Sequence, residues 1–366
     1  MKRHNAALAA ALMLAGWQTA HAQSNVQLYG VIDVAVEHVT NASATGGSIT
    51  RMPSISGGMM PSRIGFRGTE DLGGGLKAIF ALENGFSADT GSQGQGRLFG
   101  RQAWVGLAGS WGQVTLGRTY SMLFSSFFES DVIGPSQFSI GSLDTYLPSA
   151  RHDNSIAYSG KFGAYTVGAT YSLGRDNSAA GGPSATNCPG EVANDSRACR
   201  NWSASLKYDS GSWGLVGAYD RYNGGTGAAA AFGPASSAQS DTRGHVGGYV
   251  KLGELKLAGG FVRRDNEGSA ATPRSNLSYL GATYLWSPVL VIDAQVARQS
   301  VRNSNRSADL IVLRANYLLS KRSSVYAMIG NINNDGASAV ALSAGGTAGG
   351  AGMSQNGVLA GIKHAF

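Results

Sequence analysis

Apolar and polar residues alternate with a period of two along most of the chain after residue 25. This alternation predicts β-strands with one polar and one apolar face. Sixteen such runs are predicted, at residues 26–39, 62–69, 76–86, 97–108, 113–118, 154–159, 164–173, 202–208, 213–222, 245–251, 255–264, 276–285, 289–299, 309–317, 323–331 and 355–366. The pattern indicates an all-β chain that runs as an antiparallel meander.

The connections between these runs alternate between short and long. A tight Gly-rich turn at 71–75 follows the second run, for example, and the longer loop 87–96 follows the third. Outer-membrane barrels combine an even number of strands with tight periplasmic turns and long outer loops. Their strands cross the membrane with about 9–11 tilted residues. The sequence therefore predicts a 16-stranded antiparallel transmembrane β-barrel. A soluble all-β protein is the alternative, but it gives no reason for every second connection to be long.

The third long connection, residues 118–154, has no clear helical or alternating period. It is rich in apolar and acidic residues, namely Phe124, Phe127, Phe128, Phe138, Leu143, Tyr146 and Leu147 with Glu129, Asp131 and Asp144. A loop of this length in a compact domain is usually functional, and its aromatic residues need a surface to pack against. We interpret it as a third outer loop folded into the barrel lumen, where its carboxylates face arginines of the wall.

The N-terminal residues resemble an export signal. Lys2 and Arg3 precede a short apolar run at 6–16, and the sequence Ala20-His21-Ala22 stands before Gln23. This is the pattern of a secretory signal peptide, and the apolar run is too short to span a membrane as a helix. We expect residues 1–22 to be removed and residues 23–366 to form one barrel domain. The alternative is an N-terminal core helix.

Composition excludes several classes of protein. The chain has 53 Gly in 366 residues, about twice the usual ~7%. No apolar stretch of ~18 residues follows residue 22, which argues against a helical membrane protein. Residues 1–22 carry two basic residues and no acid, so their removal lowers the net charge from +7 to +5. This modest, dispersed charge does not indicate a nucleic-acid partner.

Cysteine and histidine usage gives no sign of catalysis. Cys188 and Cys199 lie in one polar segment, and an oxidising compartment favours a disulfide between them. Two cysteines alone do not make a zinc site. The chain shows no G-x-S-x-G or H-E-x-x-H motif, and His152 beside Asp153 would point to the opposite face of a strand. We expect no catalytic residue, metal or cofactor; the alternatives are a barrel enzyme or an adhesin without an open pore.

Several segments resemble the general, non-specific outer-membrane porins of the neisserial and β-proteobacterial type. They are Leu28-Tyr-Gly-Val-Ile-Asp33, the stretch 62–86 that begins Ser62-Arg-Ile-Gly-Phe-Arg-Gly-Thr-Glu-Asp71, Arg101-Gln-Ala-Trp-Val-Gly-Leu107, Trp111-Gly-Gln-Val-Thr-Leu-Gly-Arg118, Asn154-Ser-Ile-Ala-Tyr158, Leu319-Ser-Lys-Arg322 and Gly361-Ile-Lys-His-Ala-Phe366. The resemblance implies a homotrimeric, water-filled diffusion pore for ions and small hydrophilic solutes. It also implies contact with outer-membrane lipid and lipopolysaccharide, and a terminal Phe366 that the barrel assembly machinery reads.

Alternation also selects candidate pore residues, because lipid-facing Arg or Lys near the membrane midplane costs ~2–4 kcal/mol. Arg63 and Arg67 then point inward, with Ile64 and Phe66 outward. Arg101 points inward if Trp104 faces lipid.

Arg118 and Arg151 flank the long loop. Arg63, Arg101 and Arg151 also occupy positions that resemble the family's constriction arginines. We expect these five arginines and the loop acids Glu129, Asp131 and Asp144 to line the constriction, with a moderate anion preference. The alternative for each arginine is a lumen residue of no special role.

Overall fold

The computed structural model describes residues 25–53, 57–176, 186–229 and 232–366. The long strands are β1 (Asn25–Val39), β3 (Arg63–Gly73), β4 (Leu76–Gly85), β5 (Gln102–Gly109), β6 (Gly112–Tyr120), β7 (Arg151–Phe162), β8 (Tyr165–Gly174), β9 (Asn201–Asp209), β10 (Trp213–Asn223), β11 (Ser240–Leu252), β12 (Leu255–Asn266), β13 (Arg274–Ser287), β14 (Leu290–Val301), β15 (Ser307–Leu318), β16 (Ser323–Asp335) and β17 (Gln355–Ala365). The short elements are β2 (Ile49–Arg51), α2 (Met122–Ser126), η1 (Ile140–Ser142) and η2 (Leu147–Ser149).

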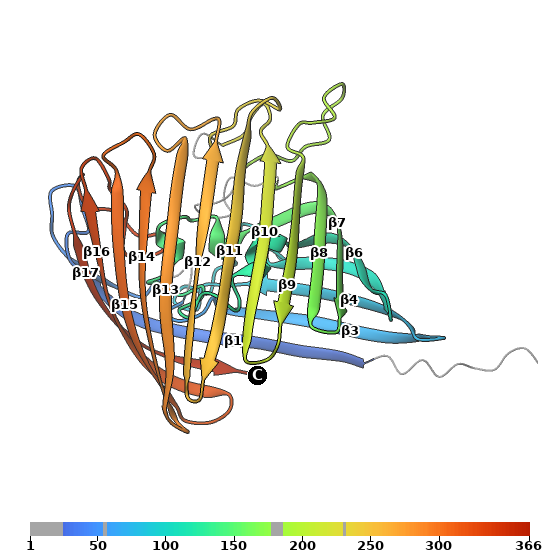
Figure 1. The fold of residues 1–366 in the computed structure, drawn as a ribbon, viewed down its shortest axis with the longest axis horizontal. Coiled ribbons are helices and arrows are strands. Elements are labelled where there is room, and N and C mark those ends of the chain that lie inside the picture. Colours follow the sequence, from blue (N-terminus) through green and yellow to red (C-terminus); the bar gives the residue numbers. More distant parts are fainter. Residues whose placement is uncertain (1–24, 54–56, 177–185, 230–231) are drawn as a thin grey trace, which may run out of the picture.

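The long strands form one closed antiparallel ring (Figure 1). Each pairs with its neighbours in the chain, and the ring closes where β1 pairs with β17 from Val31↔Ala365 to Val39↔Gly357. The other edge of β1 pairs with β3 and β2. Closure leaves no free sheet edge, which a lipid-embedded sheet requires. The predicted 16-stranded antiparallel barrel is thereby confirmed.

Each predicted run coincides with one long strand, but several boundaries and one short strand were not predicted. β2 lies within the first long connection, where three residues are too few to show alternation. β11 begins at Ser240 rather than at residue 245. This start was missed because the first residues of the strand are polar and show no alternation. β5 begins at Gln102 rather than at residue 97.

Side-chain burial alternates along the strands as a barrel requires. On β15, Val312 and Arg314 are buried while Ile311 and Leu313 are exposed. The exposed apolar faces form the outer surface, where hydrocarbon would cover them. Among the described residues, no helix is both long enough and apolar enough to cross a membrane.

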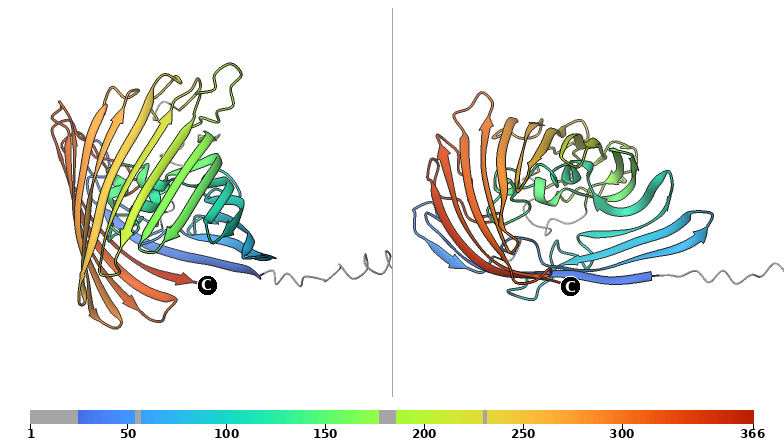
Figure 2. Two further views of the ribbon diagram at one scale, coloured as in Figure 1. Left: turned by 45° about the vertical axis from the view of Figure 1, so that its right-hand side comes forward. Right: turned by 60° about the horizontal axis from the view of Figure 1, so that its bottom comes forward.

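Residues 121–150, between β6 and β7, pack against the buried faces of the strands (Figures 1 and 2). The helix α2 begins at Ser121, whose hydroxyl accepts a hydrogen bond from the Phe124 backbone N–H, a common N-cap arrangement. A five-residue helix is too short to show a period in the sequence. The side chain of Phe138 is fully buried against Gly330 and Gly357. These glycines are cross-strand partners on β16 and β17, and a Cβ on either would approach the Phe138 ring within 2.9 Å and 2.7 Å, respectively.

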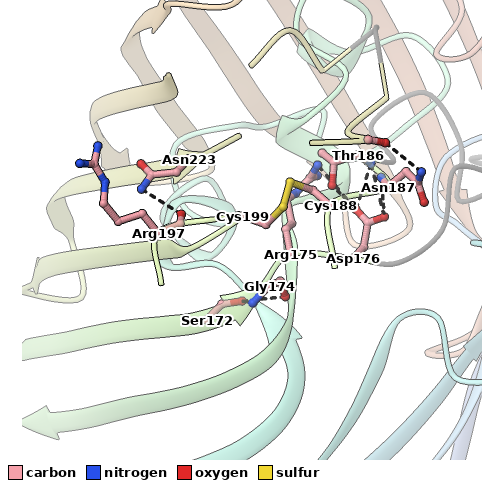
Figure 3. The surroundings of a disulfide bond; sticks show 11 residues. Ser172, Gly174, Arg175, Asp176, Thr186, Asn187, Cys188, Arg197, Cys199 and Asn223 are labelled. Carbon is pink, nitrogen blue, oxygen red and sulfur yellow. Dashed lines mark hydrogen bonds and ion pairs between the residues drawn. A yellow bond between two sulfur atoms is a disulfide. The ribbon is translucent and has the colours of Figure 1, made fainter. Parts of the chain in front are cut away.

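Cys188 and Cys199 form the predicted disulfide (Figure 3). Both sulfurs belong to the buried apolar cluster. The Cys188 carbonyl accepts from the Arg175 backbone N–H at 3.1 Å, and the Cys199 N–H donates to the Gly224 carbonyl at 2.9 Å. The disulfide therefore closes a loop within the β8–β9 connection, and the Cys199 backbone hydrogen bond joins that loop to the start of the β10–β11 connection.

The C-terminus completes the ring. The Phe366 backbone exchanges two hydrogen bonds of 3.1 Å with Gly30, and its ring lies where a side chain at position 30 would stand. Only glycine at position 30 leaves room for this ring. The role of Phe366 as an assembly signal stays a prediction, as does the signal peptide at 1–22, which lies outside the described residues.

Candidate pore constriction

A cavity of about 400 Å³ separates strands β3–β6 from the segment 121–150. Arg63, Glu83, Arg101 and Tyr120 line it from the wall. The segment contributes Phe124, Phe127, Phe128, Asp131, Gly134, Pro135, Ser139, Ile140, Gly141, Leu147 and Pro148. The cavity is thus basic and polar on one side and mainly apolar on the other.

Glu83 on β4 organises the basic side. Its carboxylate accepts from Arg101 Nε at 2.6 Å and from the Tyr29 hydroxyl at 2.9 Å. Arg63 Nε lies 3.8 Å from the same carboxylate. Antiparallel pairing sets Glu83 opposite Gly65 on β3 and Gln102 on β5, so residues from three neighbouring strands meet at one carboxylate.

Tyr120 brings Arg151 to the same cluster. The Tyr120 hydroxyl accepts from Arg101 Nη2 at 2.8 Å and from Arg151 Nη2 at 3.4 Å. The Arg151 guanidinium also lies over the Tyr120 ring, 4.8 Å from its centre, where the ring's negative face attracts a cation. Arg63, Arg101 and Arg151 are therefore brought together around Glu83 and Tyr120.

The two other predicted arginines lie apart from this cluster. Arg67 is exposed, donates to Gln27 Oε1 at 2.9 Å and lies over the Tyr29 ring. Arg118 donates to the Gly100 carbonyl at 2.8 Å and forms an ion pair with Asp153. Neither side chain lines the cavity.

The hydrogen-bond partners of the loop acids are residues other than these five arginines, although one of the acids does face an arginine of the wall, as expected. Asp144 forms two hydrogen bonds with Arg243 on β11, at 2.7 and 3.0 Å. Glu129 accepts from Lys207 at 3.0 Å. Asp131 lines the cavity, yet its carboxylate accepts from the Gln295 amide at 3.0 Å and from backbone N–H groups of its own loop. Alternation shows which strand charges point inward but gives no partner for a carboxylate on an irregular loop.

The environments of Asp144 and Asp131 shift the pKa values of their carboxyl groups in opposite directions. Burial alone would raise the pKa of Asp144, but Arg243 and Arg264 hold it below its usual range. Burial raises the pKa of Asp131 above its usual range, against hydrogen bonds from the Gly134 N–H and Gln295. Asp144 is therefore a stable anion at neutral pH, whereas Asp131 holds its charge less firmly.

Glu83, Tyr120 and Arg243 were not among the predicted constriction residues. The alternation of β4 places Glu83 on the inward face, and that signal was available. Arg243 lies in the part of β11 that was not predicted. The condition set for Arg101 was wrong: Trp104 lines an inner cavity with Gln102, while Val105 is 58% exposed. Arg101 is nevertheless buried beside Glu83, because it precedes the first residue of β5 and does not follow the alternation of that strand.

Buried histidines show no catalytic arrangement. His152 is fully buried, with Nε2 3.8 Å from Asp220, whereas Asp153 pairs with Arg97 and Arg118. His152 and Asp153 thus point to different sites, as predicted from the strand geometry. Within the described residues, no group of three His, Cys, Asp or Glu side chains could hold a metal ion.

Comparisons with known proteins agree with this architecture. The profile of the Gram-negative porin family matches residues 6–337. Outer membrane porin protein 32 of Delftia acidovorans is 33% identical over the full length of both chains. An outer membrane porin protein of Bordetella pertussis is 34% identical over 59% of each chain.

Solved structures show the same fold. An anion-selective porin from Comamonas acidovorans has 26% identity and a TM-score of 0.76, covering 94% of this chain and 100% of that one. OmpT of Vibrio cholerae, solved in a trimer form, has 13% identity and a TM-score of 0.63, covering 94% of this chain and 99% of that one. The chain therefore belongs to the Gram-negative porin family and is a pore-forming channel of the outer membrane.

Proposed function

We propose that this channel is a water-filled diffusion pore for ions and small hydrophilic solutes, with a moderate preference for anions. The main support for this preference is that Arg63, Arg101 and Arg151 are grouped around Glu83 and Tyr120, with Glu83 as the carboxylate of the cluster. An excess of fixed positive charge in a narrow passage lowers the barrier for anions and raises it for cations.

We further propose that residues 121–150 are the third outer loop, folded inward to narrow the pore. Its contacts reach widely separated strands: Ser126 meets His245 on β11 at 2.7 Å, and Gln295 on β14 donates to Asp131. Arg314 on β15 donates to the backbone carbonyl of Ile133 at 2.8 Å. These partners lie on buried strand faces, which supports a loop held on the lumen side.

Anion preference is tested by the zero-current potential across a planar bilayer under a potassium chloride gradient. The unmodified pore should prefer chloride. The preference should fall stepwise as Arg63, Arg101 and Arg151 are changed to Ser, because each change removes one charge; a charge about 4 Å from an ion is worth ~4 kcal/mol at an effective dielectric near 20, before screening. Raising the salt should weaken the preference, since the Debye length is only ~8 Å at 0.15 M.

Arg302→Ser is the control for that series, because Arg302 is exposed in the β14–β15 connection. This variant should keep the selectivity of the unmodified pore. A cation-selective unmodified pore would show that the loop acids or Glu83 dominate the passage and would reject the proposal.

We propose that the mature chain begins at Gln23 and assembles as a homotrimer. The proposal rests on the residues before Gln23 and on the resemblance of the chain to trimeric porins. Mass spectrometry of protein extracted in detergent without heating should give three times the mass of residues 23–366. A monomer alone would reject the trimer, and a subunit that retains residues 1–22 would reject the cleavage site. Lipopolysaccharide and the barrel assembly machinery are the further partners we expect.

We assign no catalytic residue and no cofactor to the chain. His152 and His245 are buried within hydrogen-bonded packing and offer no surface to a substrate. A barrel enzyme or an adhesin without an open pore would give no steady conductance in the same bilayer, so this experiment separates the proposed pore from both alternatives.

A further inference from the structure

An aromatic ladder runs from the arginine cluster, where Tyr120 belongs to the wall, onto the loop side of the cavity. The Tyr120 and Phe124 rings stack with centres 4.3 Å apart, and Phe124 meets Phe128 edge-on at 5.1 Å. All three residues line the cavity. Pro135, Ile140, Leu147 and Pro148 continue the apolar surface on the loop side.

Phe128 is the unusual member of the ladder. It is 62% exposed, although it belongs to the segment that packs against the buried strand faces. Its neighbour Phe127 is buried, and its ring stacks on His245 at 4.2 Å. Exposing a phenylalanine in a wet passage forgoes the stabilisation that burial gives, so this ring is available to a passing molecule rather than to the fold.

Arg63 has donors available to an anion. Its Nη1 donates to the Pro61 carbonyl at 3.1 Å, and its Nη2 faces the Met60 sulfur at 3.4 Å. Sulfur is a weak acceptor, and the 3.8 Å separation from Glu83 is too long for a hydrogen bond. Glu83 is already engaged by Arg101 and Tyr29. The guanidinium of Arg63 can therefore donate two parallel hydrogen bonds to a carboxylate.

We propose that the passage favours organic anions with an aromatic body over small hydrophilic anions of the same charge. The carboxylate meets Arg63 and the ring meets Phe128 and the rest of the ladder. The cavity of about 400 Å³ lies in the usual size range of small-molecule sites, about 300–1,000 Å³. This inference rests on the proposed function, because it needs an open pore with net positive charge at the constriction.

The test compares benzoate, acetate and benzyl alcohol, which separate the ring from the charge. Each is added to single channels in potassium chloride, and the concentration that halves the chloride current is measured. Benzoate should block at a concentration roughly three- to tenfold lower than acetate, as expected from one aromatic contact. Benzyl alcohol should block weakly, because it lacks the carboxylate.

Phe128→Ser should abolish the difference between benzoate and acetate, because it removes the exposed ring from the cavity lining. Phe128→Leu, which keeps an apolar side chain, should retain part of the difference. Val192→Ser is the matched control, because Val192 is 50% exposed in the β8–β9 connection, far along the chain from the ladder. Arg63→Ser should weaken block by both carboxylates.

The outcomes separate this inference from the proposed function. A pore that prefers chloride over potassium but blocks equally with benzoate and acetate overturns the aromatic preference alone. An unchanged preference in Phe128→Ser also overturns it. A pore without anion preference overturns the proposed function first, and this inference with it.

Discussion

Replacing Arg243 with Met should raise the single-channel conductance, make the open current fluctuate and destabilise the barrel by about 3–5 kcal/mol. The Arg243 side chain is 1% exposed and bonds to Asp144 through Nε and Nη2. It also donates to the Tyr222 hydroxyl and to Asp241 at 3.1 Å. Its removal leaves Asp144 buried without its hydrogen-bonded cation, so residues 121–150 lose an ion pair that holds them to the wall.

Arg264→Met is the matched control for this prediction. Arg264 also pairs with Asp241, at 2.8 Å, but forms no hydrogen bond with the loop. It should lower the free energy of unfolding and change the conductance less than Arg243→Met does, because Arg264 acts on Asp144 only through its charge. Planar-bilayer recording gives the conductance, and urea unfolding in lipid vesicles gives the free energy. An unchanged conductance in Arg243→Met would mean that the apolar cluster around Phe138 holds the loop alone.

Lowering the pH tests the ion pair between Asp144 and Arg243 without a mutation. Because the pKa of Asp144 in the folded protein lies below its usual value, its ion pair is fully present above the ordinary Asp pKa of about 3.9. The stabilisation is lost only as the pH falls through the lower, folded pKa. The open current at pH 5 should therefore fluctuate no more than at pH 7, because the Asp144–Arg243 ion pair is intact at both.

The strands were predictable because the alternation that indicates a strand lies within the residues of that strand. On β14, Asp293 and Gln295 are buried while Val296 is exposed, and the sequence shows that alternation directly. The disulfide was predictable for a similar reason, since Cys188 and Cys199 are close in the chain and have no other cysteine to choose. The alternation and turn residues were sufficient to predict the strands. The short spacing of the two cysteines and the oxidising compartment were sufficient to predict the disulfide.

The partners of the loop were not predictable, because they depend on contacts between distant residues. Asp144 and Arg243 are 99 residues apart in the chain, and nothing near either one specifies the other. An irregular segment shows no repeating pattern in the sequence, so the direction of a carboxylate on it cannot be inferred. Arg63 and Arg101, by contrast, occur in segments that resemble a known family, and the structure brings them together around Glu83.

Changing Glu83 to Gln should increase the anion preference by roughly threefold in permeability ratio, since it removes the negative charge among the arginines at the constriction. The amide oxygen can still accept from Arg101, and the amide NH2 can donate to the Tyr29 hydroxyl oxygen, so the geometry of the cluster should persist. The zero-current potential under a potassium chloride gradient measures the change. Glu70→Gln is the matched control, because it removes an exposed carboxylate from β3 at a distance from the cavity lining.

The direction of the Glu83→Gln effect distinguishes two roles for this carboxylate. If ions sense its charge, anion preference rises, and the added change Arg63→Ser should return the pore toward its original selectivity by restoring the net charge. If Glu83 only positions Arg101, whose Nε lies 2.6 Å away, the isosteric amide leaves selectivity unchanged and the double variant shows the loss caused by Arg63→Ser alone. A shift toward cations would mean that the arginines move away once the carboxylate is gone, and that Glu83 holds the anion-selective arrangement in place.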